Sequence, residues 1–388
     1  MQIPIFRGGG CMKKVKLGEI CEIVTGSTPK SSNPNYWNGE YKWITPAEIS
    51  DDDFIVFDTQ RKITELGIEE TGLKSFPTGT VLLSSRAPIG KVVISGCEMY
   101  CNQGFKNFIC SNKINNEYLY YFFKSRKKYL NILGRGATFK EISKSIVSDI
   151  EIFLPTYGIQ RKQVKVLKKI DKLIYTRKEQ LIEFEYLVKS RFNEMFGDPV
   201  FNEMRWRRCK LKDISVEKLA YGSGASAIDF SGLRYIRITD IDECGNLKID
   251  KKSPSHYDEK YLLNTGDILF ARSGATVGKT FLYSKEKYGS AQYAGYLIRL
   301  IPNLSLVNPV FVYHFTNTKF YNDFIAKVQN AVAQPNINAK QYGELDFILP
   351  PLSLQNEFAD FVAQVDKSQF ACQIVIKLWR NSLKSSII

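Results

Sequence analysis

The sequence has few of the side chains that build metal or disulfide sites. It contains two histidines, and its eight cysteines form no Cys-x-x-Cys pair. Structural zinc sites draw on clustered Cys and His ligands, and disulfide frameworks belong mainly to small secreted domains. We therefore expect no metal on this chain and interpret the cysteines as free thiols in a reducing cytoplasm.

Long apolar runs are missing as well. No segment approaches the roughly 20 apolar residues of a membrane-spanning helix, and residues 1–11 lack the apolar stretch of a secretion signal. The sequence therefore predicts neither a membrane protein nor a secreted precursor. Translation can start at Met1 or at Met12, because residues 2–11 lie outside the internal repeat described below.

Acidic residues are outnumbered, since 40 Asp and Glu face 54 Lys and Arg and the 388-residue chain carries a net charge of +14. An apolar fraction of 44% and a charged fraction of 24% are ordinary for globular proteins, so a disordered or fibrous chain is excluded. The positive excess favours a polyanionic partner, nucleic acid above all. A basic housekeeping enzyme is the alternative.

The second half of the chain repeats the first in four places, in the same order. A period of half the chain is too long for a solenoid and indicates a duplicated unit. Within the third match we take Arg86 and Lys91 as the counterparts of Arg272 and Lys279. The matched segments are 16–20 with 210–214, 43–49 with 235–241, 79–91 with 266–279, and 149–160 with 344–355.

Each unit begins with a globular part that mixes strands and helices. Short apolar runs after a Gly turn predict strands, and apolar residues at helical spacing predict helices. The fold class is therefore α/β, with two duplicated mixed domains. Strands are expected at 81–85, 92–94, 268–271 and 280–283, and helices at 118–129 and 310–324.

Apolar residues recur at seven-residue spacing after each Leu-Pro pair. Such heptads predict helices that pair along a narrow seam, and forty helical residues would reach about 60 Å. Two ordinary amphipathic helices, each packed on its own domain, are the alternative. The seam positions are Leu167, Ile174, Leu181 and Val188 in the first helix and Phe358, Val365, Ile376 and Trp379 in the second.

The order of these parts suggests an architecture. We expect a first domain at 1–155, a central spacer helix at 156–197, a second domain at 198–350 and a C-terminal spacer helix at 351–388. Each helix follows its own domain, so paired seams would form an antiparallel coiled coil and relate the two units by a pseudo-twofold axis. DNA has local twofold axes of its own, which dimeric readers match.

Short motifs accompany this duplication. They comprise residues 16–20, 85–91, 102–105, Leu154-Pro155 with Gln160, 195–206, and Leu349-Pro350 with Gln355. With these motifs the chain resembles, over nearly its whole length, the specificity subunit of type I restriction-modification enzymes. The resemblance implies that the globular parts are target recognition domains and that the helices are spacers that dock modification subunits.

The two copies depart from each other in their loops. Residues 292–295, Gln-Tyr-Ala-Gly, stand where Asn-Gln-Gly-Phe at 102–105 would be expected to recur. Residues 139–142, Phe-Lys-Glu-Ile, are likewise replaced by Gln-Pro-Asn-Ile at 334–337. Such divergence is expected if the two domains recognise different half-sites.

Signals of catalysis are weak. The run Asn-Pro-Asn-Tyr at 33–36 differs at its third residue from the Asn-Pro-Pro-Tyr of amino-methyltransferases, and a turn is the better interpretation. Residues 273–280 miss a phosphate-binding loop by one Gly and lead into a predicted strand rather than a helix. The acidic run at 51–53 is interpreted as a solvated turn.

Basic residues in loops and on one helix face are the candidate DNA contacts. Arg is the best reader of guanine edges, and Lys is a strong phosphate contact. Exposed charges at strand ends, or a solvated helix face, are the alternatives. The candidates are Arg86, Lys91, Lys106, Arg272 and Lys279 in the domains, and Arg161, Lys165, Lys168 and Lys172 along the first helix.

These observations favour a non-catalytic, cytoplasmic subunit that recognises a bipartite target in double-stranded DNA. Its partners would be modification (methyltransferase) and restriction (endonuclease and translocase) subunits. S-adenosylmethionine, ATP and Mg²⁺ would be bound by those partners, with no cofactor on this chain. A methyltransferase or nuclease fused to recognition domains, or a coiled-coil scaffold that binds no DNA, are the alternatives.

Overall fold

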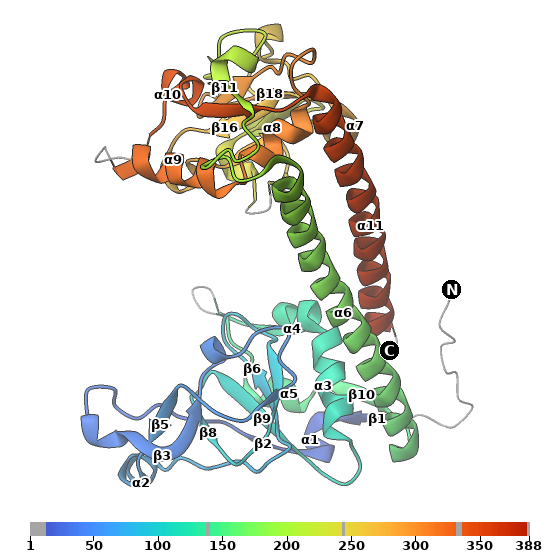
Figure 1. Cartoon of the computed structure of the whole chain (residues 1–388). Helices are drawn as coiled ribbons and strands as arrows, with labels where there is room; N and C mark the ends of the chain where they lie inside the picture. The colour runs from blue at the N-terminus through green and yellow to red at the C-terminus, as the bar shows by residue number, and fades with distance from the viewer. Residues whose placement is uncertain (1–12, 137–139, 243–244, 331–335, 386–388) are drawn as a thin grey trace. The chain divides into compact units, whose positions relative to one another are not determined.

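The computed structural model describes residues 13–136, 140–242, 245–330 and 336–385. Its contacts divide the chain into unit 1, formed by residues 1–179 and 372–388, and unit 2, formed by residues 180–371. Each unit is mixed α/β and contains one globular part with a portion of each long helix (Figure 1). Met1, Met12, Cys11, Phe139, Cys244, Gln334 and Pro335, which entered the sequence analysis, lie outside the described residues.

The globular part of unit 1 is built on two small sheets and a terminal strand pair. Five strands lie in the order β2-β9-β6-β7-β4, three in the order β5-β3-β8, and β1 pairs with β10. The strands are β1 (Lys13–Lys16), β2 (Cys21–Val24), β3 (Trp37–Ile44), β4 (Ile55–Val56), β5 (Arg61–Ile63), β6 (Val81–Ser84), β7 (Val92–Ser95), β8 (Tyr100–Cys101), β9 (Phe105–Cys110) and β10 (Glu151–Leu154). The helices are α1 (Leu17–Ile20), α2 (Glu65–Thr71), α3 (Asn116–Ser125), α4 (Lys127–Leu133) and α5 (Lys144–Ser148).

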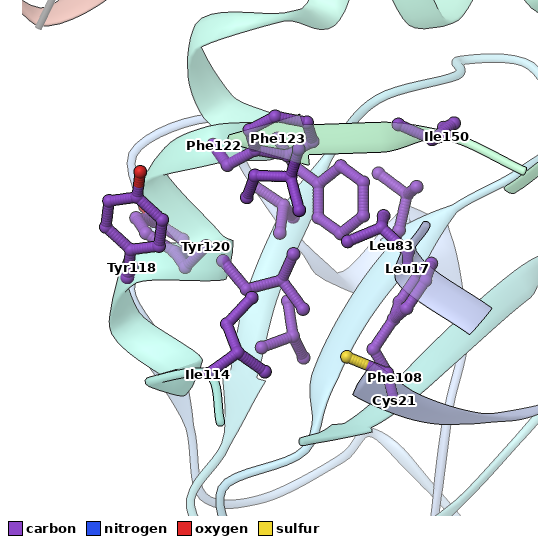
Figure 2. Packing of buried hydrophobic residues seen from close by; sticks show 14 of the residues in the cluster. Leu17, Cys21, Leu83, Phe108, Ile114, Tyr118, Tyr120, Phe122, Phe123 and Ile150 are labelled. Atoms are coloured by element: carbon purple, nitrogen blue, oxygen red, sulfur yellow. The ribbon is translucent and has the colours of Figure 1, made fainter. Parts of the chain in front are cut away.

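Helix α3 supplies much of the core of unit 1. The Asn115 side chain caps its first turn by accepting a hydrogen bond from the Tyr118 backbone. Figure 2 shows Phe122 and Phe123 gathered with Leu83 of β6 and Phe108 of β9. Each of these side chains is almost fully buried, which stabilises the fold by roughly 1.5–3 kcal/mol per residue.

Unit 2 repeats this plan with a shorter central sheet. Four strands lie in the order β12-β19-β16-β17, while β13 pairs with β15, β14 with β18 and β11 with β20. The strands are β11 (Arg207–Lys210), β12 (Ala220–Tyr221), β13 (Ala227–Asp229), β14 (Arg234–Ile236), β15 (Lys252–Pro254), β16 (Ile268–Ala271), β17 (Thr280–Leu282), β18 (Ala291–Tyr293), β19 (Leu297–Leu300) and β20 (Asp346–Leu349). The helices are α7 (Lys285–Tyr288), α8 (Pro309–Phe315), α9 (Lys319–Asn330) and α10 (Ala339–Gly343).

The backbone hydrogen bonds confirm the duplication. The Ser84 amide donates to the Lys91 carbonyl at 2.8 Å, and the Ala271 amide donates to the Lys279 carbonyl at 2.9 Å. The Leu17 amide likewise meets the Ile150 carbonyl as Leu211 meets Leu345, both at 2.9 Å. Equivalent bonds at equivalent places show that the two sequence copies fold on one framework.

Two long helices follow the Leu-Pro pairs, α6 (Tyr157–Phe196, 40 residues) and α11 (Leu352–Ser385, 34 residues). A buried glutamine fixes the start of each one. Gln160 accepts from the Asn115 amide at 2.8 Å and donates to the Lys113 and Pro155 carbonyls at 3.0 and 2.9 Å. Gln355 makes the matching bonds to Asn308, Leu306 and Pro350. Each helix is thus bonded to a loop of its own domain.

Within unit 2 the two helices pack with opposite directions. The Phe192 and Phe196 rings of α6 each lie 5.5 Å from the Phe358 ring of α11, while Val188, earlier in α6, shares their cluster with Val365, later in α11. In unit 1, Leu383 near the end of α11 packs against the cluster that holds Leu167. The antiparallel pairing is therefore seen inside unit 2, whereas the pseudo-twofold axis stays a prediction.

The predicted seam positions differ in burial. Leu181 and Trp379 are half-buried, and the others are 7% exposed or less. The buried ones are Leu167, Ile174, Val188, Phe358, Val365 and Ile376. No helix in the described part of the chain is long and apolar enough to cross a membrane.

Candidate nucleic-acid interface

Arg86 in the loop that follows β6, Lys106 of β9 and Glu141 before α5 form a cluster of three charges in unit 1. Arg86 Nε donates to Glu141 Oε2 at 2.9 Å, and Lys106 Nζ lies 3.2 Å from Glu141 Oε1. Desolvation raises the pKa of Glu141, but hydrogen bonds from Lys106 and Arg86 outweigh it, so the net pKa shift is downward. The Arg86 side chain remains 46% exposed, whereas that of Lys106 is 6% exposed.

Two of the predicted basic contacts face inward. Lys91 Nζ donates to the backbone carbonyls of Pro46 and Ile49, at 3.0 and 2.5 Å, and so ties a neighbouring turn to the loop. Lys106 also donates to the Ser85 hydroxyl at 3.2 Å. Because their ammonium groups already have internal partners, we leave Lys91 and Lys106 out of the proposed DNA contacts. Lys279 occupies the backbone position of Lys91 in unit 2 and is half-buried.

Arg272 follows β16 in unit 2 and has a different environment. Its guanidinium carbon lies 4.7 Å from the centroid of the Tyr221 ring, and its Nε donates to Asn336 Oδ1 at 3.3 Å. Stacking on an aromatic face and an amide partner both restrict the guanidinium without neutralising it. Tyr221 and Asn336 were missed by the sequence analysis, because they are distant from Arg272 in the chain and no local pattern links them.

Arg86 and Arg272 are not counterparts, which corrects the sequence alignment. The Ile142 amide donates to the Ser85 carbonyl, and the Ile337 amide donates to the Arg272 carbonyl, both at 2.9 Å. Arg272 therefore matches Ser85, and Arg86 matches Ser273. The loop of unit 2 is one residue longer, which let the two arginines align by sequence. Neighbouring positions of extended chain direct their side chains to opposite sides.

The loop at 102–105 was also aligned out of register. The Asn102 amide donates to the Ile44 carbonyl at 3.2 Å, and the Ala294 amide donates to the Ile236 carbonyl at 2.9 Å. Residues 102–105 thus correspond to 294–297 rather than to 292–295. The exposed Tyr296 occupies the place of Gly104, so the two units differ here more than the sequence comparison indicated.

The residues on the basic face of α6 differ in their contacts. Lys168 forms an ion pair with Glu117 of α3 and lies 5.1 Å from the Phe54 ring, so it helps dock α6 on unit 1. The Lys168 side chain is nevertheless 45% exposed, and the other three residues of the predicted stripe are exposed as well. They are Arg161, Lys165 and Lys172.

The acidic run at 51–53 forms an exposed turn, as its sequence interpretation predicted, and two of its carboxylates also form ion pairs. Asp51 forms an ion pair with Lys127 at 2.7 Å, and Asp52 forms one with Lys178 of α6 at 2.8 Å. The hydrogen bond from Lys178 lowers the pKa of Asp52. The turn therefore tethers the domain to the long helix, which sequence could not reveal because Asp52 and Lys178 are 126 residues apart.

The motifs that resembled catalytic sequences have structural roles. Asn33 caps a short 3-10 turn (Pro34–Tyr36) by accepting from the Asn35 amide at 3.1 Å, which confirms the predicted turn. The loop after Arg272 forms another 3-10 turn (Gly274–Thr276) and then enters β17, as predicted, so its amides do not begin an α-helix. Among the described residues no group of His, Cys, Asp and Glu could hold a metal ion.

Comparison with known proteins finds one family over most of the chain. A family model described as "Type I restriction modification DNA specificity domain" matches it twice, at residues 11–185 and 206–374. The type I restriction enzyme MjaIX specificity subunit of Methanocaldococcus jannaschii is 39% identical over 197 residues, 50% of this chain and 45% of that protein. The EcoDI specificity subunit of Escherichia coli is 22% identical over 396 residues, 91% of this chain and 81% of that protein.

Solved structures share the fold at low identity. The S subunit of a type I restriction-modification system from M. genitalium gives a TM-score of 0.53 at 14% identity, covering 100% of this chain and 99% of that one. A chain solved in work on complex assembly and conformational transition of the type I R-M system gives 0.61 at 16%, covering 97% of each.

Proposed function

Because the chain belongs to the type I restriction modification DNA specificity family, we propose that it is the DNA-recognition subunit of such a complex. Each unit would bind one half of a bipartite target in double-stranded DNA. The observation that carries the proposal is one backbone framework, repeated twice, that presents different side chains at matching loop positions. A common frame with divergent loops is what two readers of different half-sites require.

The loop chemistry supports recognition of DNA rather than scaffolding alone. Arg86 and Arg272 are partly exposed basic groups in the loops that follow β6 and β16. Arginine can bind guanine edges or phosphates, and the net charge of the whole chain, +14, favours a polyanionic partner.

The two long helices would hold the units at a fixed separation. The helical rise is fixed at about 1.5 Å per residue. Gln160 and Gln355 bond each helix to its own domain. Inserting four residues after Thr176 would lengthen α6 by about 6 Å and rotate the remainder of the helix by about 40°. We expect the preferred gap between half-sites to shift or binding to vanish. An unchanged gap with full activity would refute the helices as a ruler.

Partner chains would carry out methyl transfer and DNA cleavage. Modification subunits would bring S-adenosylmethionine, and restriction subunits would bring ATP and Mg²⁺. The helices offer apolar surface for such partners: Ile182 and Tyr186 of α6 in unit 2 are 55% and 66% exposed, and Ile374 and Leu378 of α11 in unit 1 are 42% and 59% exposed. Each pair is four residues apart on one helix face, a spacing suited to docking.

Selection from a randomised duplex library tests the proposal. The full chain, alone and with its modification subunit, is incubated with the library at several salt concentrations, and bound duplexes are sequenced. We expect a two-part motif with a constant gap and binding that weakens as salt rises. A chain that binds no DNA would instead be a scaffold. Methyl transfer by the purified chain alone would make it an enzyme.

A further inference from the structure

Three side chains from separate segments of unit 2 meet around the guanidinium group of Arg272. Tyr221 comes from β12, Arg272 follows β16, and Asn336 precedes α10. The Tyr221 ring centroid is 4.7 Å from the guanidinium carbon, and Asn336 Oδ1 is 3.3 Å from Nε. One face and one edge of the guanidinium are thus occupied by protein.

The residues around Arg272 are themselves fixed by the backbone. The Arg272 amide donates to the Tyr296 carbonyl at 3.1 Å, and its carbonyl accepts from the Ile337 amide at 2.9 Å. The Tyr221 hydroxyl accepts from the Ala339 amide at 3.1 Å. A long side chain that is held in this way loses little conformational entropy when it binds a ligand.

The cluster keeps the positive charge of Arg272 available. Tyr221 and Asn336 are neutral, and no carboxylate in the described part of unit 2 forms an ion pair with Arg272. Arg86 in unit 1 is instead paired with Glu141. Around Arg272 the surface is open, since Tyr221 is 40% exposed and Tyr296 is 61% exposed.

We propose that Arg272 determines specificity in unit 2 by binding one guanine of its half-site, with Tyr221 and Asn336 as positioning residues. The proposal rests on the proposed function. The terminal nitrogens of a fixed guanidinium can donate in parallel to O6 and N7 of guanine in the major groove. A phosphate contact would need only charge, which the many other surface lysines supply. Unit 1 has Ser85 at this position, so its half-site would be recognised differently.

Library selection with Arg272→Gln and Arg272→Lys tests the assignment. We expect both variants to lose preference for one guanine in one half of the motif, by roughly 5-fold to 150-fold, while the other half is unchanged. Lysine keeps the charge but lacks the planar guanidinium that stacks on Tyr221 and donates in parallel from a fixed position. The charge-matched control is Lys285→Gln, at an exposed position of α7, and it should retain the full motif.

Substitutions at Tyr221 separate positioning from a general structural role. Tyr221→Phe keeps the ring beneath Arg272 and should retain the motif, whereas Tyr221→Leu should relax the same base position as Arg272→Gln. Asn336→Ala should relax that position too, by a smaller factor. Thermal unfolding of each variant shows whether unit 2 remains folded.

Two results would overturn the assignment. If Arg272→Gln weakens all sequences equally and leaves the motif intact, Arg272 binds phosphate. If the motif and the affinity are both unchanged, Arg272 makes no contact, and the bipartite target of the unaltered chain still supports the proposed function. An unaltered chain that selects no motif overturns the proposed function itself, and the assignment with it.

Discussion

The two units share a backbone and differ in where they place charge. In unit 1 Thr80 lies directly before β6 and Asn107 lies in β9; in unit 2 they are replaced by Asp267 and Arg299, which form a buried ion pair at 2.6 Å. At the surface Arg86 is paired with a carboxylate, whereas Arg272, at a different loop position, contacts neutral groups. The comparison teaches that one framework tolerates a neutral or a charged pair at a matching interior site, while the loops carry their arginines at positions that do not match.

The largest effect is expected when one unit is exchanged. Residues 209–350 would be replaced by the corresponding domain of a relative with a known target. Each unit has its own core and its own loops, so only one half of the recognised sequence should change. The new half-site should be preferred by about 10³-fold or more over the old one. Methylation mapping measures the motif, and a simultaneous change in both halves would contradict independent recognition.

The buried ion pair of unit 2 can be tested by replacing Asp267 and Arg299 with the threonine and asparagine found at the matching positions of unit 1. Arg299→Asn alone would leave the Asp267 carboxylate buried without its cation and should destabilise unit 2 by about 3–5 kcal/mol. Adding Asp267→Thr removes that unpaired charge and should restore most of the stability. Chemical denaturation of the three proteins measures the differences. A double variant no more stable than Arg299→Asn would show that the pair contributes specific bonds that the neutral residues cannot replace.

The repeated frame could be predicted from sequence because its signals are local. Heptad spacing and the Leu-Pro pairs predicted the long helices, and the four matched segments predicted the duplication. The partners of Arg272 could not be predicted, since Tyr221, Arg272 and Asn336 meet only after folding. The sequence alignment of Arg86 with Arg272 was wrong for a related reason. When loop lengths differ, hydrogen bonds and not residue identity decide which loop positions correspond.

Histidine supplies a further contrast, because both histidines of the chain lie in unit 2. His314 lies 5.3 Å from each of the rings of Tyr313 and Phe358, and burial lowers its pKa to about 4. The folded state therefore binds its proton less readily than the unfolded state. Stability that is present above the unfolded pKa of 6.5 should be lost as the pH falls toward 4, by up to about 3 kcal/mol.

Hydrogen exchange resolves this loss by unit. Amides of β16 and β19 should lose protection between pH 6.5 and 4 to a greater degree than those of β6 and β9. In His314→Phe, whose new ring suits the aromatic surroundings, β16 and β19 should lose no more protection than β6 and β9. If β16 and β19 still lose more protection in that variant, carboxylates rather than His314 account for the acid sensitivity of unit 2.

The smallest effect is expected from the exposed basic residues of α6, which belong to unit 1. Lys165→Gln with Lys172→Gln removes two charges and keeps helix propensity nearly constant. If these lysines lie along the gap DNA, affinity should fall equally for all sequences, and the log–log salt slope should become shallower by about 0.9 per lost contact. Lys367→Gln with Lys377→Gln on α11 is the charge-matched control and should leave the slope unchanged.

The ion-paired neighbour completes this test. Lys168→Gln should leave the salt slope unchanged, because its ammonium group is paired with Glu117, and should reduce stability by no more than about 1 kcal/mol. Dissociation of a modification subunit from the Lys165 and Lys172 variant in the absence of DNA would assign the face to that partner. Normal assembly with an unchanged slope would leave these lysines as the solvated side of a long helix, and the contacts to DNA would then lie in the two domains.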